Sequence, residues 1–151
     1  MLTPGQIQSY LDELENYLLI PENQKKVELS RAWANKNPSH PGTYVAFEEG
    51  KVVYVGETGN IRERMKDLLD SRHHTFRRNI GKYNFSKLDG YLNASPKDKF
   101  PPHIEEKVVS WITEKIKISV LPSDLGRKEL EERLIEKYQP IYNEKEKRKC
   151  R

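Results

Sequence analysis

The side chains of this sequence that could perform chemistry are two tyrosines, an arginine and a glutamate. Tyr44 and Tyr54 lie in neighbouring segments rich in β-branched and aromatic residues, Arg64 follows ten positions after Tyr54, and Glu131 comes much later. A phosphodiester gains negative charge on its nonbridging oxygens while it is cleaved. A metal ion and a guanidinium group are natural stabilisers of that charge, so these residue types are compatible with chemistry on a phosphodiester.

Two predicted strands, residues 43–47 and 52–55, carry the tyrosines. Pairing of Phe47 with Lys51 would leave a three-residue hairpin loop with glycine at its left-handed position. In that register the two tyrosines lie directly opposite each other. Because cross-strand partners share a face, both phenols would point to the same side of the sheet.

The rest of the pattern predicts an α+β fold. Apolar spacing and capping signals predict a third strand at 116–120 and helices at 3–20, 22–37, 60–69, 75–81, 104–112 and 130–138. This order predicts a small, mostly antiparallel three-stranded sheet flanked by helices. We expect an N-terminal helical extension over residues 1–40, a main domain over 41–143 and a charged tail over 144–151.

Several short motifs, taken together and in order, resemble the GIY-YIG nuclease family. They are Gly42-Thr43-Tyr44 on the first strand, Tyr54-Val55-Gly56 on the second, Arg64 on the next helix, Glu131 on the last helix, and Asn143 beyond it. Thr43 replaces the usual aliphatic residue of the first motif, and its β-branched side chain fits a strand.

The resemblance implies hydrolysis of one phosphodiester strand, assisted by one divalent metal, Mg²⁺ or Mn²⁺. It implies that Glu131 binds the metal, that Arg64 contacts the scissile phosphate, and that Tyr44 and Tyr54 line the site near the attacking water. Asn143 is expected to help hold the site together, with Gly42 and Gly56 as structural positions. A tyrosine of ordinary pKa is a poor base at neutral pH, so a neighbouring cation must assist it.

Helical spacing supports Glu131 independently. Glu131, Ile135 and Tyr138 fall at i, i+4 and i+7, which places the carboxylate beside an apolar stripe that faces the body of the protein. The alternative is an ordinary surface carboxylate that flanks the stripe.

The sequence departs from the family one helical turn after the arginine. Other members often have tyrosine or histidine there, but this chain has Leu68, and Glu57 stands where some members carry lysine. We expect His73 or His74 to take over proton handling at an ordinary pKa near 6.5, with Lys66 as the next candidate. The alternative is that both histidines belong to a solvated loop.

The net charge of +4 is concentrated in one stretch. Seven basic residues lie between Arg62 and Lys82, against three acidic ones. We expect four of them to contact backbone phosphates without reading the base sequence: Arg72, Arg77, Arg78 and Lys82. The alternative is a solvated helix face.

The predicted function is a metal-dependent DNA endonuclease of the restriction, mobile-element or repair type. A non-catalytic nucleic-acid-binding module on the same fold is the alternative that Leu68 keeps open. The only cysteine, Cys150, excludes an intrachain disulfide and a cysteine zinc cluster. The sequence has no apolar run long enough for a membrane span and no signal peptide, so we expect a cytoplasmic protein. The sequence leaves open whether the protein associates with the nucleoid and whether it forms a homodimer.

Overall fold

The computed structural model describes residues 1–143, and the predicted charged tail lies outside them. The elements, in chain order, are α1 (Pro4–Leu19), η1 (Pro21–Asn23), β1 (Lys25–Lys26), α2 (Arg31–Asn35), β2 (Gly42–Glu48), β3 (Lys51–Thr58), α3 (Ile61–Asp67), α4 (Thr75–Phe85), α5 (Pro102–Lys115), β4 (Ile116–Pro122) and α6 (Arg127–Tyr138). The predicted α+β class is confirmed.

The sheet has the strand order β1-β4-β2-β3, and all its neighbouring strands are antiparallel. The fourth strand, β1, corrects the prediction of a helix over residues 22–37. Lys25 and Lys26 pair with Ile118 and Lys117 of β4, which is nearly a hundred residues away in the sequence. Local spacing holds no signal for such a pairing. Within that segment only α2 is α-helical, and Ser30 caps it by accepting a hydrogen bond from the Trp33 amide.

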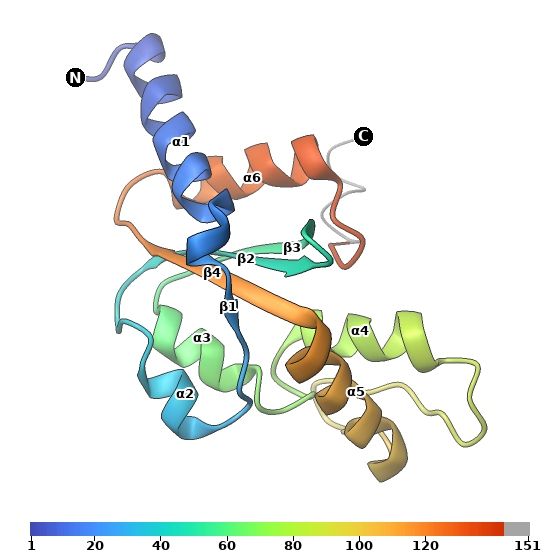
Figure 1. The fold of residues 1–151 in the computed structure, drawn as a ribbon. Helices are drawn as coiled ribbons and strands as arrows, with labels where there is room; N and C mark the ends of the chain where they lie inside the picture. Colours follow the sequence, from blue (N-terminus) through green and yellow to red (C-terminus); the bar gives the residue numbers. More distant parts are fainter. Residues whose placement is uncertain (144–151) are drawn as a thin grey trace.

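Helices cover both faces of the sheet (Figure 1). The face that carries Val45 and Val55 packs against α1 and α6, whereas the face that carries Tyr44, Ala46 and Tyr54 packs against the layer containing α2 to α5. Alternation along the strands therefore sends the tyrosines into the second layer. Glu131 starts from the first layer, on α6.

The hairpin register differs from the predicted one. Glu48 pairs with Lys51, so the loop has only two residues, Glu49 and Gly50, with positive φ angles of 52° and 77°. Two positive φ angles are those of a type I′ turn, which matches the twist of the strands. A bulge between Ala46 and Phe47 then places Tyr44 opposite Gly56 and Ala46 opposite Tyr54. Tyr44 and Ala46 are two residues apart, so both tyrosines still share one face.

Charged contacts attach α1 to α6, the helix that carries Glu131. The buried carboxylate of Glu15 lies 3.2 Å from Arg133 Nε and also accepts a hydrogen bond from Lys137. The α1 helix begins as predicted, because Thr3 and Gln6 form a reciprocal capping box. In the part of the chain that the structure describes, we find no helix with the length and apolarity needed to cross a membrane.

Candidate active site

Three polar side chains converge on the hydroxyl of Tyr44, which is only 1% exposed. Arg64 Nε donates to this hydroxyl over 3.2 Å, and His74 Nε2 lies 3.3 Å from it. Tyr54 forms a further hydrogen bond with Tyr44, and the two ring centroids are 6.1 Å apart. Four residues from two strands, a helix and a helix cap thus meet around one phenol oxygen.

The two glycines of the motifs leave room for this arrangement. A Cβ at position 56 would collide with the ring and hydroxyl of Tyr44, directly across the hairpin. A Cβ at position 42 would collide with the carbonyl of Leu121 on β4. Both positions therefore require a residue without a side chain.

Arg64 is held in place by its own helix and by the loop after it. Asn60 caps α3 by accepting a hydrogen bond from the Glu63 amide, as its position in the sequence predicts. The Arg64 guanidinium binds Tyr44 through Nε, while Nη1 lies 3.3 Å from Asp67 and donates to the His73 carbonyl over 3.1 Å. These contacts fix the plane of the guanidinium beside the phenol.

His74 is the N-cap of α4, and this determines which ring nitrogen carries the proton. Its Nδ1 accepts a hydrogen bond from the Phe76 amide over 3.2 Å, so Nδ1 has no proton in the neutral ring. The proton lies on Nε2, which donates it to the Tyr44 oxygen. His74 is therefore a fixed hydrogen-bond donor to Tyr44.

The expected ordinary pKa near 6.5 is wrong for His74. Burial, followed by the positive charges of Arg64, Arg78 and Arg77, holds the pKa of His74 well below that value. The ring is fully buried and stays neutral at neutral pH. His73, by contrast, is exposed, and its contribution to Tyr44 is indirect, through the carbonyl that binds Arg64.

This burial predicts that the protein loses stability in acid. The folded state holds His74 neutral below pH 6.5, whereas the unfolded chain takes up a proton there, so the free energy of unfolding falls as the pH falls. Between pH 7.5 and 5.5 we expect wild type to lose about 1.4 kcal/mol relative to His74→Asn, which keeps an N-cap acceptor but cannot be protonated. Urea unfolding at several pH values measures the difference. His73→Asn is the matched control and should follow wild type, because it leaves His74 in place; parallel curves for wild type and His74→Asn would contradict the assignment.

Glu131 reaches the same site from the other layer of the fold. Its carboxylate is half-buried, and its negative charge acts on the Tyr44 phenol and raises the pKa of that group. The larger cause of the raised Tyr44 pKa is burial, while the charge and hydrogen bond of Arg64 oppose it. Tyr44 is therefore protonated at neutral pH in the free protein.

The donor set around Glu131 fits a weakly coordinated magnesium or manganese ion. Among the described residues, no group of three or more His, Cys, Asp or Glu side chains could enclose a metal. Mg²⁺ does not require such a group, because one or two carboxylates suffice when water and substrate phosphate oxygens complete the shell. A single half-buried glutamate is compatible with that kind of site.

Sequence reasoning missed Arg127, which joins the end of β3 to α6 one helical turn before Glu131. Its Nη1 lies 3.1 Å from Glu57 Oε2 and also donates to the Thr58 carbonyl. Glu57 is therefore half of an ion pair that attaches the helix of Glu131 to the strand of Tyr54. The spacing of four residues between Arg127 and Glu131, which puts them on one helix face, was the available signal.

Asn143 brackets one residue of β3. Its buried side chain accepts a hydrogen bond from the Val55 amide over 2.8 Å and donates to the Val55 carbonyl over 3.0 Å. Val55 lies between Tyr54 and Gly56, so this clamp fixes the strand at the site.

The basic stretch is not the free surface that its composition predicts. Arg77 is 4% exposed and binds Ser71, the Leu68 carbonyl and Glu105. It is not available as a DNA contact, because leaving these partners would strip a buried ion pair. Three other basic residues were expected to bind phosphates. Arg72 forms a two-pronged pair with Asp70, Arg78 donates to the carbonyls of residues 71 and 72, and Lys82 is exposed.

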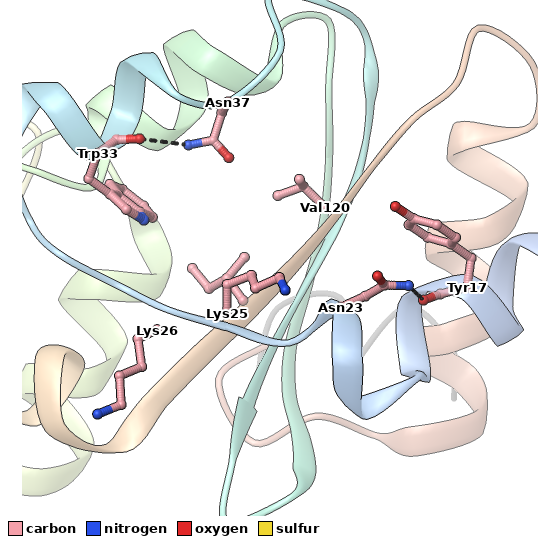
Figure 2. Close-up of a pocket in the computed structure, with 8 residues that line it drawn as sticks. Tyr17, Asn23, Lys25, Lys26, Trp33, Asn37 and Val120 are labelled. Carbon is pink, nitrogen blue, oxygen red and sulfur yellow. Dashed lines mark hydrogen bonds between the residues drawn. The ribbon is translucent and has the colours of Figure 1, made fainter.

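A separate pocket lies at the β1 edge of the sheet (Figure 2). It has a volume of about 150 Å³, with Lys25, Lys26 and Trp33 among its lining residues. None of the eight residues that line it belongs to the predicted site. Its floor includes Val120, the cross-strand neighbour of Tyr44 on β4.

Comparison with known proteins gives a family. A family model described as the GIY-YIG catalytic domain matches residues 17–150. No curated protein shows significant sequence similarity to the chain. Among solved structures, the fold is similar to the N-terminal endonuclease domain of UvrC from Thermotoga maritima. A point mutant of that domain bound to its catalytic divalent cation gives a TM-score of 0.42 at 18% identity, covering 75% of this chain and 92% of that one. The magnesium-bound form gives 0.41 at 21%, covering 75% and 93%.

Proposed function

This chain belongs to the GIY-YIG family of catalytic domains, and we propose that it is a divalent-metal-dependent endonuclease that hydrolyses phosphodiester bonds in double-stranded DNA. The observation that carries the proposal is the Tyr44 hydroxyl. It receives hydrogen bonds from Arg64 and His74, and the negative charge of Glu131 raises its pKa in addition to burial.

Glu131 would hold the Mg²⁺ or Mn²⁺ ion, which supplies Lewis-acid stabilisation of the phosphate charge when it is bound. Arg64 would bind the scissile phosphate, because its guanidinium is held in a fixed plane beside Tyr44 and stays charged. In the reaction, a water oxygen attacks phosphorus and loses a proton, one phosphorus–oxygen ester bond breaks, and the leaving oxygen takes up a proton, so that proton release and uptake balance.

Tyr44 acts in this proposal as a positioning residue, because its buried hydroxyl holds the Arg64 guanidinium and the Tyr54 side chain in place at the site. Its raised pKa keeps it protonated at neutral pH, and its oxygen already accepts from Arg64 and His74. His74 supplies a polar side-chain donor, which the apolar side chain of Leu68 does not offer. Because the His74 ring is neutral and fixed, its part is to orient Tyr44, and the proton-handling part expected for a histidine is not assigned to it.

A non-catalytic nucleic-acid-binding module is the second candidate, and Leu68 is the observation that favours it. Leu68 is completely buried at the C-cap of α3, so this position, one helical turn after Arg64, presents no polar side chain to a substrate. If turnover needs a polar group there, the fold would bind DNA without cutting it.

Incubation of the purified protein with supercoiled plasmid and with branched DNA separates the two candidates. With Mg²⁺ or Mn²⁺ we expect nicked or linear products, and with EDTA we expect none. A retarded complex that never yields product in either metal would support the binding module and overturn the nuclease. The ratio of nicked to linear product shows whether one strand or both are cut, and a preference for branched DNA would favour a repair role over restriction.

A further inference from the structure

A cavity of about 440 Å³ lies between α2, α3 and the segment that follows α3. Its lining residues are Arg31, Asn35, Lys66, Leu69, Asp70 and His73. We propose that this cavity binds a backbone phosphate of the DNA strand that runs through the site, adjacent to the scissile phosphate. This proposal rests on the nuclease function. It extends the surface that contacts the substrate to α2, which lies outside the Gly42–Asn143 motifs.

One residue, His73, belongs both to the cavity and to the candidate active site. His73 is one of the residues that line the cavity, and its carbonyl accepts the hydrogen bond from Arg64 Nη1 over 3.1 Å. The next residue, His74, faces inward and binds Tyr44. One DNA strand carries a phosphate about every 3.4 Å along the helix axis, so a strand held by Arg64 brings further phosphates to the neighbouring surface.

The charge that lines this cavity is positive. Arg31 is exposed at the start of α2, and Asn35, one turn later, lies on the same side of that helix. Lys66 lies 3.4 Å from Glu63, but both side chains are substantially exposed, at 38% and 63%, and such pairs are weak and easily exchanged for a phosphate.

Asp70 is the only carboxylate that lines the cavity, and its charge is already neutralised. Two hydrogen bonds from the Arg72 side chain, with a third from its amide, hold the pKa of Asp70 far below its usual range. Lys99 lies 4.0 Å from the same carboxylate. Arg31 and Lys66 therefore dominate the field in the cavity.

This surface also replaces the one that composition predicts. Arg72, Arg77 and Arg78 are engaged with Asp70, with Glu105 and with backbone carbonyls. The cations of the cavity come from α2 and α3, so the DNA backbone is expected to cross these helices and not the face of α4 that carries Arg77.

Arg31→Ala tests the proposal, with Lys36→Ala as its matched control. Lys36 caps the other end of α2, is exposed, carries the same charge and does not line the cavity. Fluorescence anisotropy in EDTA, with a labelled duplex and increasing salt, measures affinity without cleavage. For Arg31→Ala we expect about tenfold weaker binding and a log–log salt slope that is shallower by about 0.9, the value for one lost phosphate contact.

Lys36→Ala should leave the affinity within about twofold and the slope unchanged, and Arg31→Lys should restore most of the binding. Duplexes in which one phosphate at a time is replaced by a neutral methylphosphonate provide a second measurement. Wild type should be weakened at a position beside the cut, and Arg31→Ala should be insensitive there. Equal affinities and slopes for Arg31→Ala and Lys36→Ala, in a protein that still cleaves DNA, would overturn this surface and leave the nuclease intact. If Arg31→Ala binds DNA more weakly but the wild-type protein never cleaves DNA, the result would support the phosphate-binding surface and overturn the nuclease function.

Discussion

Glu131→Gln is expected to abolish DNA cleavage while DNA affinity stays within a few-fold of wild type. Glutamine keeps the size of the side chain but loses the charge that would hold the divalent ion. Loss of one preorganised electrostatic group in a hydrolytic site typically costs about 10²–10³ in rate, and removal of the metal adds to that figure. Single-turnover cleavage of plasmid at saturating protein and Mg²⁺ measures the rate, and anisotropy in EDTA measures the affinity.

The control for this variant lies one position further along α6. Glu132→Gln makes the same chemical change on an exposed residue of the same helix and should cleave at the wild-type rate. Cleavage by Glu131→Gln at more than about a tenth of the wild-type rate would remove Glu131 from the mechanism, whatever the control does.

Tyr44→Phe is the variant with the second large effect. It deletes the oxygen on which Arg64 and His74 converge, so the Arg64 guanidinium loses the contact that fixes it at the site. Misplacement of a catalytic group by about 1 Å can cost about 10² in rate. The same deletion leaves a buried donor on His74 without its acceptor, for which we expect about 1–3 kcal/mol lower stability.

Rate and stability must be measured separately for Tyr44→Phe, by single-turnover cleavage below the unfolding transition and by urea unfolding. Tyr17→Phe removes a hydroxyl from a side chain that is 44% exposed on α1 and is the control for the chemical change. A rate for Tyr44→Phe within threefold of wild type, in folded protein, would show that this hydroxyl takes no part in cleavage.

The proposed division of roles explains how the chain can dispense with a polar residue at Leu68. In the folded protein Leu68 fills the core, and its carbonyl binds the buried Arg77. The donor to Tyr44 comes instead from the cap of the next helix, six residues later in the chain. A helix cap is a rigid location for a donor, because the ring nitrogen that accepts from the Phe76 amide sets the orientation of the other nitrogen.

Local sequence determined the residue types of the site and most of the elements that carry them. The caps at Thr3 and Asn60, the hairpin strands and the helical position of Glu131 all depend on neighbours within a few residues, so spacing alone predicts them. The shared face of Tyr44 and Tyr54 was predicted as well, although the register behind that prediction was wrong. The bulge and the two-residue turn compensate each other in their effect on which side the tyrosines face.

Tertiary structure alone decided which charged and polar side chains are exposed and which are buried against partners within the protein. The strand β1 forms because its residues pair with β4. The buried guanidinium of Arg77 lies against Glu105 of α5. The pKa of His74 lies well below its ordinary value because its ring is buried against Tyr44 and Phe76. Burial and pKa depend on what the rest of the chain places around a residue, and the spacing of that residue from its neighbours in the sequence holds no information about it.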